Sequence, residues 1–368
     1  MHIVIVATAG ESLIKFRGPL IREWVKRGNR VTCISIEDPS EMEHDIKELG
    51  ASYYQVSGNR TGTSIVEGLR MIKRYKKAFK ELKPDVCFLY MSKPIAFGGL
   101  AAISLKIKRL YVFQTGLEIA FYSKGFKNWL IRIVLKHLFR KVQKKCDTVF
   151  FMSHYDQEKM IEWKLVDEKK TFYVDGSGVD MNKFQRTPLP KDVSVLMTAR
   201  LVWSKGIREY IEAAKYVKQL HPEVRFMLVG GLDENSEALS KDELDSLVNE
   251  GVIDYKGYLK DVRPALEEAS IFVLPSYHEG KGTAILEAQA CGRVIVTTDA
   301  PGCSETVVDG YNGFIVPVKN GKALAEKILY LVDNSHLISE MGDNAYEYCK
   351  KTFSSDIIVN QISNKMDV

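Results

Sequence analysis

Residues 271–288 read IFVLPSYHEGKGTAILEA, and this stretch indicates the fold of the chain. The apolar run at its start predicts a buried strand, the small residues after it predict a turn, and the remainder predicts a helix. Two glycines flank Lys281 and let the backbone approach a ligand closely. Unpaired N–H groups and the dipole at the start of the helix favour an anion such as phosphate.

Two carboxylates lie in the same stretch, Glu279 on the turn and Glu287 inside the helix. Phosphate repels a carboxylate, whereas sugar hydroxyls donate hydrogen bonds to one. A site for both phosphate and a polyol would suit a sugar nucleotide. The alternative interpretation is a strand, turn and helix that carry two solvated acids.

The chain has 368 residues, of which 45% are apolar and 27% charged, and this predicts two ordinary globular domains. No apolar run approaches the roughly 20 residues of a membrane-spanning helix. Residues 2–6 read as a strand and not as a signal peptide. The six cysteines are scattered, with no pair at metal-ligand spacing, so we expect reduced thiols and a cytoplasmic location.

The net charge of +5 is distributed unevenly between the two halves of the chain. Residues 1–145 contain 27 Lys and Arg against 12 Asp and Glu, whereas the rest of the chain contains 25 against 35. This basic excess predicts an anionic partner for the N-terminal half, either nucleic acid or an acidic membrane surface.

Short apolar runs alternate with amphipathic segments in both halves of the chain, which predicts βαβ units and parallel sheets. We therefore expect an α/β protein of two Rossmann-like, doubly wound domains that face each other across a cleft. Glycines and prolines between 176 and 190 interrupt the pattern. The expected domains are 1–187 and 188–353, with 354–368 returning to the first.

Two cations lie where the second domain begins. Arg200 leaves a strand end, and Lys205 begins the next helix, so both can converge on one anion. Together they would stabilise the charge of a departing diphosphate, as a metal ion does elsewhere. The alternative is two ordinary surface charges. Gly230 closes the next strand, and Tyr258 and Leu259 follow another strand and could offer backbone groups to a base.

Segment 124–145 combines a basic stripe with aromatic and aliphatic residues. A basic residue, or in one case an asparagine, recurs every four positions: Lys124, Asn128, Arg132, Lys136, Arg140 and Lys144. Trp129 belongs to the apolar residues beside this stripe. Such a helix suits the surface of an anionic membrane. The alternative is a sheet-covering helix with a solvated face.

The first turn of the chain, around Gly10, is either a bare connection or a backbone contact to a diphosphate.

Motifs along nearly the whole chain resemble those of glycosyltransferase family 4, the retaining nucleotide-sugar transferases of GT-B architecture. They comprise Ala9-Gly10, Ser177-Gly178-Val179-Asp180, Arg200 with Lys205-Gly206, Val229-Gly230-Gly231, Glu279-Gly280, Leu286-Glu287-Ala288, Ala290-Cys291-Gly292 and Asn312-Gly313. Within the family, Phe16-Arg17 with Pro19 and Thr115-Gly116-Leu117 resemble bacterial enzymes that extend undecaprenyl-diphosphate-linked glycans. Those enzymes include N-acetylgalactosaminyltransferases of protein N-glycosylation and O-antigen assembly.

The resemblance implies a role for each candidate residue. Arg200 and Lys205 would bind the donor diphosphate, Glu279 the donor sugar, and Glu287 the ribose. The backbone at Gly280, Lys281, Gly282 and Thr283 would contact sugar and diphosphate, with Gly10 approaching the diphosphate from the other domain. Tyr258 and Leu259 would contact uracil, and Gly230 would border the nucleotide. The acceptor candidates are Phe16, Arg17, Thr115, Gly116 and Glu118.

The resemblance also implies a front-face retaining mechanism that needs no cofactor and no metal. The expected partners are a UDP-sugar (UDP-GalNAc as the best guess), a polyprenyl-diphosphate-linked saccharide and the anionic inner face of the plasma membrane, but no nucleic acid. Lys124, Trp129, Arg132, Lys136 and Arg140 would face that membrane. Two departures from the family leave alternatives: Lys281 either touches the sugar or points to solvent, and Glu118 is either an acceptor contact or an inert loop residue.

Three competing functions are retained. The first is a glycosyltransferase with another donor or acceptor lipid, including UDP-Gal, UDP-GlcNAc, UDP-Glc or GDP-mannose as donor. The second is a sugar-nucleotide epimerase of the same architecture, which would require more acid and base residues in the cleft. The third is a non-enzymatic basic binder, for which Glu279 and Glu287 would have no role and affinity would depend strongly on salt.

Overall fold

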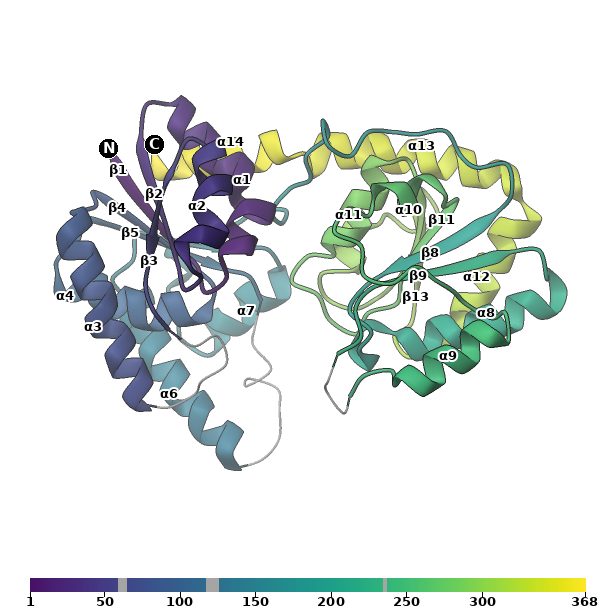
Figure 1. The fold of residues 1–368 in the computed structure, drawn as a ribbon, viewed down its shortest axis with the longest axis horizontal. Coiled ribbons are helices and arrows are strands. Elements are labelled where there is room, and N and C mark those ends of the chain that lie inside the picture. The colour runs from purple at the N-terminus through teal and green to yellow at the C-terminus, as the bar shows by residue number, and fades with distance from the viewer. Residues whose placement is uncertain (59–64, 117–125, 234–236) are drawn as a thin grey trace. The chain divides into compact units, whose positions relative to one another are not determined.

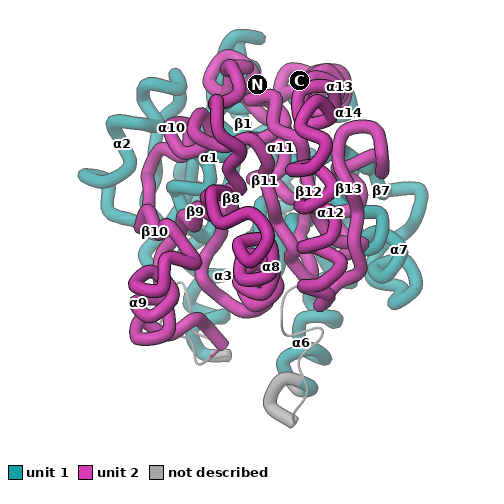
Figure 2. The backbone as a smooth tube through the Cα atoms, turned by 90° about the vertical axis from the view of Figure 1, so that its right-hand side faces the viewer, with its two compact units in different colours: residues 1–177, 358–368 teal, residues 178–357 magenta. Residues whose placement is uncertain are grey.

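The computed structural model describes residues 1–58, 65–116, 126–233 and 237–368 (Figure 1). The chain divides into two compact units, coloured separately in Figure 2. Unit 1 comprises Met1–Ser177 with Ile358–Val368, and unit 2 comprises Gly178–Ile357. The chain thus passes into unit 2 after Ser177, earlier than the expected boundary at 187/188, and the segment from Ile358 onward belongs to unit 1.

Unit 1 is built on a seven-stranded parallel sheet of order β3-β2-β1-β4-β5-β6-β7. Its strands are β1 (His2–Val6), β2 (Arg30–Ser35), β3 (Ser52–Gln55), β4 (Val86–Tyr90), β5 (Arg109–Gln114), β6 (Thr148–Phe151) and β7 (Thr171–Tyr173). The helices of this part of the chain are α1 (Gly10–Lys26), α2 (Pro39–Glu48), α3 (Ile65–Leu82), the π-helical turn η1 (Pro94–Gly98), α4 (Gly99–Ser104), α6 (Phe126–Gln143), α7 (His154–Glu162) and the 3₁₀ turn η2 (Glu168–Lys170).

Side chains alternate between the two faces of this sheet because successive residues of a strand point in opposite directions. On β1, Ile3 and Ile5 join the buried cluster that includes α1, α2 and the C-terminal helix. Val4 and Val6 join the opposite cluster, formed with α3, α4 and α6. Both faces are apolar and covered, as a parallel sheet requires.

Unit 2 contains a six-stranded parallel sheet of order β10-β9-β8-β11-β12-β13. Its strands are β8 (Ser194–Thr198), β9 (Arg225–Val229), β10 (Asp254–Tyr255), β11 (Ile271–Leu274), β12 (Val294–Thr298) and β13 (Gly313–Val316). Its helices are η3 (Trp203–Lys205), α8 (Ile207–Leu220), α9 (Lys241–Asn249), α10 (Arg263–Glu267), α11 (Thr283–Ala290), η4 (Ser304–Thr306), α12 (Gly321–Asp333) and α13 (Ser335–Thr352), with η3 and η4 being 3₁₀ turns.

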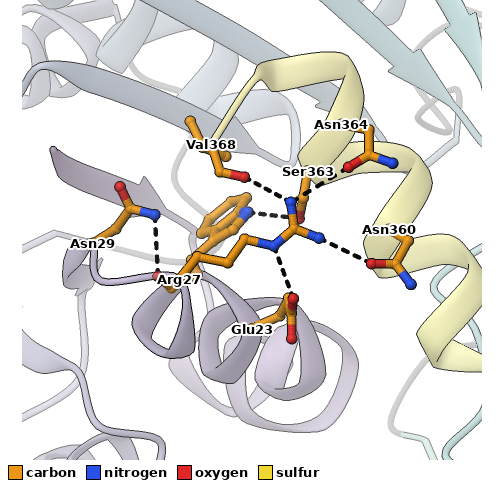
Figure 3. A network of polar contacts seen from close by, with 8 residues as sticks. Glu23, Arg27, Asn29, Asn360, Ser363, Asn364 and Val368 are labelled. Carbon is orange, nitrogen blue, oxygen red and sulfur yellow. Dashed lines mark hydrogen bonds and ion pairs between the residues drawn. The ribbon is translucent and has the colours of Figure 1, made fainter.

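The last helix, α14 (Ser355–Met366), packs on α1 in unit 1. Its buried apolar residues are Ile358, Val359, Ile362 and Met366. The Trp24 indole donates to Ser363 Oγ at 3.1 Å, and Arg27 donates to Asn360 Oδ1 at 2.9 Å and to the Val368 carbonyl at 2.9 Å (Figure 3). The C-terminal segment is therefore an integral part of the unit that the N-terminus begins.

The predicted fold class is confirmed: both units are doubly wound α/β structures with parallel sheets. β7 is not apparent from the sequence, because its three residues are only half-buried and too few to show a periodic pattern. No helix within the described residues is long and apolar enough to span a bilayer.

Candidate functional site

The candidate residues of unit 2 gather at the switch point of its sheet, where the strand order reverses between β8 and β11. Ligands of open α/β sheets bind at the carboxyl ends of the strands at such a point. Arg200 and Lys205 follow β8, and Glu279 follows β11, which is hydrogen-bonded to β8 (Figure 1). The topology therefore brings these three residues to one edge of the sheet.

Lys205 and Glu279 form an ion pair at the switch point. The Lys205 Nζ lies 2.5 Å from Glu279 Oε1, and the two side chains are 20% and 17% exposed. A backbone hydrogen bond also joins the two loops that carry these residues: the Tyr277 amide donates to the Ser204 carbonyl at 2.9 Å. The site thus holds a cation and a carboxylate together, partly shielded from water, where electrostatic interactions are stronger than in bulk solvent.

Two glycines let the loops of this edge pack backbone to backbone. Gly206 has φ +78°, and a Cβ there would lie 2.1 Å from the Pro275 carbonyl oxygen. Gly302 has φ +75°, and its Cβ would lie 2.2 Å from the Glu279 carbonyl oxygen. Any other residue would push the Lys205 and Glu279 loops away from their neighbours.

The backbone of residues 279–283 is further secured by the loop after β12. The Glu279 amide donates to the Pro301 carbonyl at 3.0 Å, and the Gly282 amide donates to the Gly302 carbonyl at 2.8 Å. Gly280 is half-buried, and Thr283 begins α11 with its Oγ1 donating to the Lys281 carbonyl at 3.3 Å. Glu287 lies one turn into α11 and is 8% exposed. A buried carboxylate thus lies on the helix that starts at this loop.

Lys281 does not point to solvent, which excludes one of the two alternatives for this residue. Its side chain is 1% exposed, and its Nζ lies 3.2 Å from Glu305 Oε2. The same nitrogen lies 5.4 Å from the centroid of the Phe353 ring. The cation is therefore directed into unit 2.

Arg200 is not paired with Glu279 in this structure. Its side chain is 71% exposed, and its Nη1 lies 3.3 Å from Asp233 Oδ2.

Gly230 closes β9 with its amide bonded to the Gly257 carbonyl at 2.9 Å. Next to Gly257, Tyr258 is 66% exposed and Leu259 packs against the core.

His278 is a residue of this site that the sequence analysis overlooked. Burial lowers the pKa of its imidazole; neighbouring Lys205 also lowers this pKa, whereas Glu279 and Glu305 raise it. The signal was its position beside Glu279 in the 271–288 stretch, but sequence alone does not show how deeply a side chain is buried.

In unit 1, Gly10 and Arg17 lie on α1 beside the switch point of the first sheet, between β1 and β4. The Gly10 amide donates to Glu37 Oε2 at 3.0 Å. Arg17 is 1% exposed; its guanidinium lies 3.8 Å from the Phe113 ring centroid and donates to Ser177 Oγ at 3.1 Å. Burial lowers the pKa of this guanidinium. Arg17 therefore contacts the interior of unit 1, and an acceptor would reach it only if that packing opened.

The remaining candidates of unit 1 lie near the same edge or on α6. Phe16, Thr115 and Gly116 are half-buried, whereas Glu118 and Lys124 lie outside the described residues. On α6, Trp129 is 50% exposed, Lys136 lies over the Trp163 ring at 4.0 Å, and Arg140 donates to the Lys164 carbonyl at 3.0 Å. Arg132 is half-buried.

Two other features do not belong to this site. A cavity of about 410 Å³ in unit 2 is lined by residues that include Arg186, Gly292 and Asp343. Gly292 lies between the end of α11 and the start of β12, at the opposite edge of the sheet. Among the described residues, one group with metal-ligand spacing is present, His44, Asp45 and Glu48, and all three are exposed on α2.

Two family models match this chain, one in each half. The model described as Glycosyltransferase Family 4 matches residues 20–181, and that described as Glycosyl transferases group 1 matches residues 180–348. The N,N'-diacetylbacillosaminyl-diphospho-undecaprenol alpha-1,3-N-acetylgalactosaminyltransferase of Campylobacter jejuni is 31% identical over 359 residues, covering 94% of this chain and 93% of the relative. The capsular polysaccharide biosynthesis glycosyltransferase CapM of Staphylococcus aureus is 26% identical, covering 98% and 95%.

Among solved structures, that of Anabaena Alr3699/HepE in complex with UDP and glucose has a TM-score of 0.82 at 17% identity, covering 100% of this chain and 99% of that one. At this identity the similarity supports the fold alone. The family models together match both halves of the chain, and the Campylobacter jejuni relative matches almost all of it. The chain therefore belongs to glycosyltransferase family 4 and is a glycosyltransferase with the GT-B fold.

Proposed function

We propose that the protein transfers a sugar, GalNAc as the first choice, from a UDP-sugar to a saccharide carried on undecaprenyl diphosphate, with retention of configuration and without a metal ion. The observation that carries this proposal is the Lys205–Glu279 pair at the switch point of unit 2. The near full-length similarity to the Campylobacter jejuni N-acetylgalactosaminyltransferase supports the choice of donor and acceptor.

In this proposal, Lys205 and Arg200 hold the donor diphosphate. The bond between the sugar C1 and the phosphate oxygen breaks, and both cations stabilise the negative charge that develops on the phosphate. Arg200 can leave Asp233 for the diphosphate at little cost, because exposed ion pairs contribute about 1 kcal/mol or less. Glu279 orients Lys205 and accepts hydrogen bonds from the donor sugar.

The rest of the donor would extend along the same edge of the sheet. Glu287 accepts from the ribose hydroxyls, and the backbone of Gly280, Lys281, Gly282 and Thr283 contacts the sugar and diphosphate. Gly230, Tyr258 and Leu259 border the uracil. In unit 1, the Gly10 amide at the start of α1 already donates to an anionic acceptor, Glu37, so it suits an anionic ligand.

Retention would follow from attack on the face that the diphosphate leaves. The acceptor hydroxyl forms the new bond to C1, and the departing phosphate oxygen takes its proton. The atoms and charges balance without a further base, so no metal is required in this scheme.

We include an anionic membrane surface as a partner in the same proposal. Trp129, Ile133 and Val134 on α6 are exposed by 50%, 46% and 39%, although α6 also contributes to the core. Cations lie along the same helix, and exposed aromatic and aliphatic side chains beside cations suit an anionic bilayer. α6 follows β5, so its first turns lie at the carboxyl edge of the sheet, the same edge as Gly10.

The decisive experiment measures nucleotide release from UDP-GalNAc, UDP-GlcNAc, UDP-Gal, UDP-Glc and GDP-mannose. Each donor is tested with a polyprenyl-diphosphate-linked sugar, with and without EDTA, and the anomeric configuration of the product is read by NMR. We expect one UDP-sugar to react, only with the lipid acceptor, and equally well in EDTA. Loss of turnover in EDTA would contradict the metal-free scheme, and epimerised donor without acceptor would indicate an epimerase.

A further inference from the structure

The Lys281–Glu305 ion pair lies beside the proposed donor site, and the side chain of Lys281 is buried in unit 2. The Lys281 side chain is 1% exposed and that of Glu305 is 20% exposed, with 3.2 Å between Nζ and Oε2. Glu305 belongs to η4, the turn that follows Gly302 after β12. The pair therefore connects the loop after β11 with the loop after β12.

This ion pair adds to backbone bonds between the same two loops. The amides of Glu279 and Gly282 donate to the carbonyls of Pro301 and Gly302. A third connection runs from α11 to η4, because Gln289 Nε2 donates to the Thr306 carbonyl at 2.8 Å. The backbone between Gly280 and Thr283 is thus held on both sides, and Lys281 provides the side-chain connection in its middle.

Lys281 also reaches the region where the chain enters and leaves unit 2. Its Nζ lies 5.4 Å from the centroid of the fully buried Phe353 ring. The Phe353 carbonyl accepts from the Val179 amide at 2.8 Å, and the Ser355 amide donates to the Val179 carbonyl at 2.9 Å. One ammonium group therefore contacts two segments that are far apart in sequence, η4 and the end of α13.

Stability alone is a poor explanation for this pair. Removing an ammonium and a carboxylate from water costs free energy, and apolar residues of similar size often stabilise a protein as well or better. Turn geometry offers no explanation either, because Gly302, whose Cβ would lie 2.2 Å from the Glu279 carbonyl oxygen, and not Lys281, provides the close backbone approach between these two loops. The pair instead fixes the distance between the two loops. Its ammonium group also balances the negative charge of Glu305 near His278.

We propose that Lys281 is a positioning residue for the donor: through Glu305 it sets the backbone of residues 280–283 and neutralises a carboxylate that would repel the donor diphosphate. This inference rests on the proposed function, since it assigns that backbone to the donor. It does not require the side chain of Lys281 to touch any substrate atom. It also gives a physical reason for a cation at a position that faces the interior of unit 2.

The test compares the wild type with the double variant Lys281→Met/Glu305→Gln, which removes both charges and keeps the side-chain lengths similar. We expect the affinity for UDP, measured by calorimetry, to fall about tenfold or more, because binding would then have to order a backbone that the ion pair holds in place in the wild type. The donor KM should rise while kcat changes little, because binding and not chemistry is affected. Amide hydrogen exchange in residues 279–283 should become faster.

The matched control is Lys322→Met/Glu326→Gln, which makes the same changes in an exposed pair on α12 of the same unit. It should leave UDP affinity and exchange unchanged. If the double variant unfolds, Lys281→Gln tests the inference instead, because it removes the cation and keeps an N–H donor for Glu305. We expect the affinity for UDP to fall in this variant too, and an unchanged affinity would contradict the inference.

The outcomes separate this inference from the proposed function. A wild type that binds no UDP and transfers from no donor would overturn the proposed function, while the exchange measurement would still test the positioning role. Wild-type UDP affinity and unchanged exchange at 279–283 in the folded double variant would overturn the role of Lys281 and leave the proposed function intact.

Discussion

The Lys205 ammonium and the Glu279 carboxylate meet at 2.5 Å, although 74 positions separate them in the chain. They are brought together because β8 and β11 are hydrogen-bonded neighbours and both loops leave the carboxyl edge of the sheet. The strand order thus places a cation beside an acid at the point where an α/β sheet binds its ligand.

Lys205→Met should abolish most of the transferase activity. We expect kcat to fall by about 100-fold to 1,000-fold, the usual cost of losing one group that stabilises developing charge. The measurement is turnover of the UDP-sugar selected by the donor experiment. Lys215→Met on α8 removes an exposed lysine of the same unit and should retain full activity. Equal losses in both variants would contradict a specific role for Lys205.

Glu287→Gln should weaken donor binding more than it slows the reaction. A hydrogen bond to a charged acceptor contributes about 1.5–3 kcal/mol, so the donor KM should rise by about tenfold to 100-fold. Steady-state kinetics at varied donor concentration provide the measurement. Glu267→Gln makes the same chemical change at an exposed position on α10 and should have no effect. An unchanged KM in Glu287→Gln would argue against the ribose contact.

Stability should fall as the pH drops below about 6.5, because burial lowers the pKa of His278 from that ordinary value. The unfolded chain then binds a proton more readily than the folded chain, so protonation favours unfolding. The stabilisation is fully present above pH 6.5 and is lost as the pH falls towards the folded pKa. Urea unfolding of unit 2 at pH 7.5, 6.5 and 5.5 measures this effect.

The control for the pH effect is His278→Asn, which should reduce the loss of stability between pH 6.5 and 5.5. His2 in unit 1 has a pKa that is also lowered, by burial first and by Arg30 second. Its contribution should appear in the unfolding of unit 1 and persist in the variant. An identical pH dependence of unit 2 in wild type and His278→Asn would contradict the prediction.

Ile362→Ala should destabilise unit 1 although it lies near the C-terminus. Ile362 is 1% exposed in the cluster formed with α1, and truncating a buried isoleucine to alanine costs about 2–5 kcal/mol. Denaturant unfolding followed by amide hydrogen exchange of unit 1 measures the change. Gln361→Ala alters an exposed neighbour on the same helix and should have little effect.

Trp129→Ser/Ile133→Ser should weaken binding to vesicles that contain an anionic phospholipid. Cosedimentation measures the bound fraction, which should also decline with salt because charge attraction contributes. Tyr216→Ser/Leu220→Ser removes comparable exposed side chains from α8 of unit 2 and should bind as the wild type does. Equal binding of both variants would contradict docking through α6.

Most of the strands and the turns of the candidate site could be predicted from the pattern of residues. β1, β4 and β11 are short apolar runs whose two faces are both covered, and such runs stand out in a sequence. The carboxyl ends of β1, β8 and β11 also indicated where Gly10, Lys205 and Glu279 lie. These features depend on local pattern and on general rules for parallel sheets, so no detailed packing was needed to infer them.

Tertiary packing decided where the side chains point. Lys281 and Arg17 read as accessible cations, yet both are buried, one against Glu305 and the other against Phe113. Arg200 pairs with Asp233 instead of converging with Lys205. The partners lie many positions away in the chain, and the burial of a long side chain depends on which distant segments cover it. These contacts cannot be predicted from the local sequence, because they form only when the order of the strands in the sheet brings the loops together.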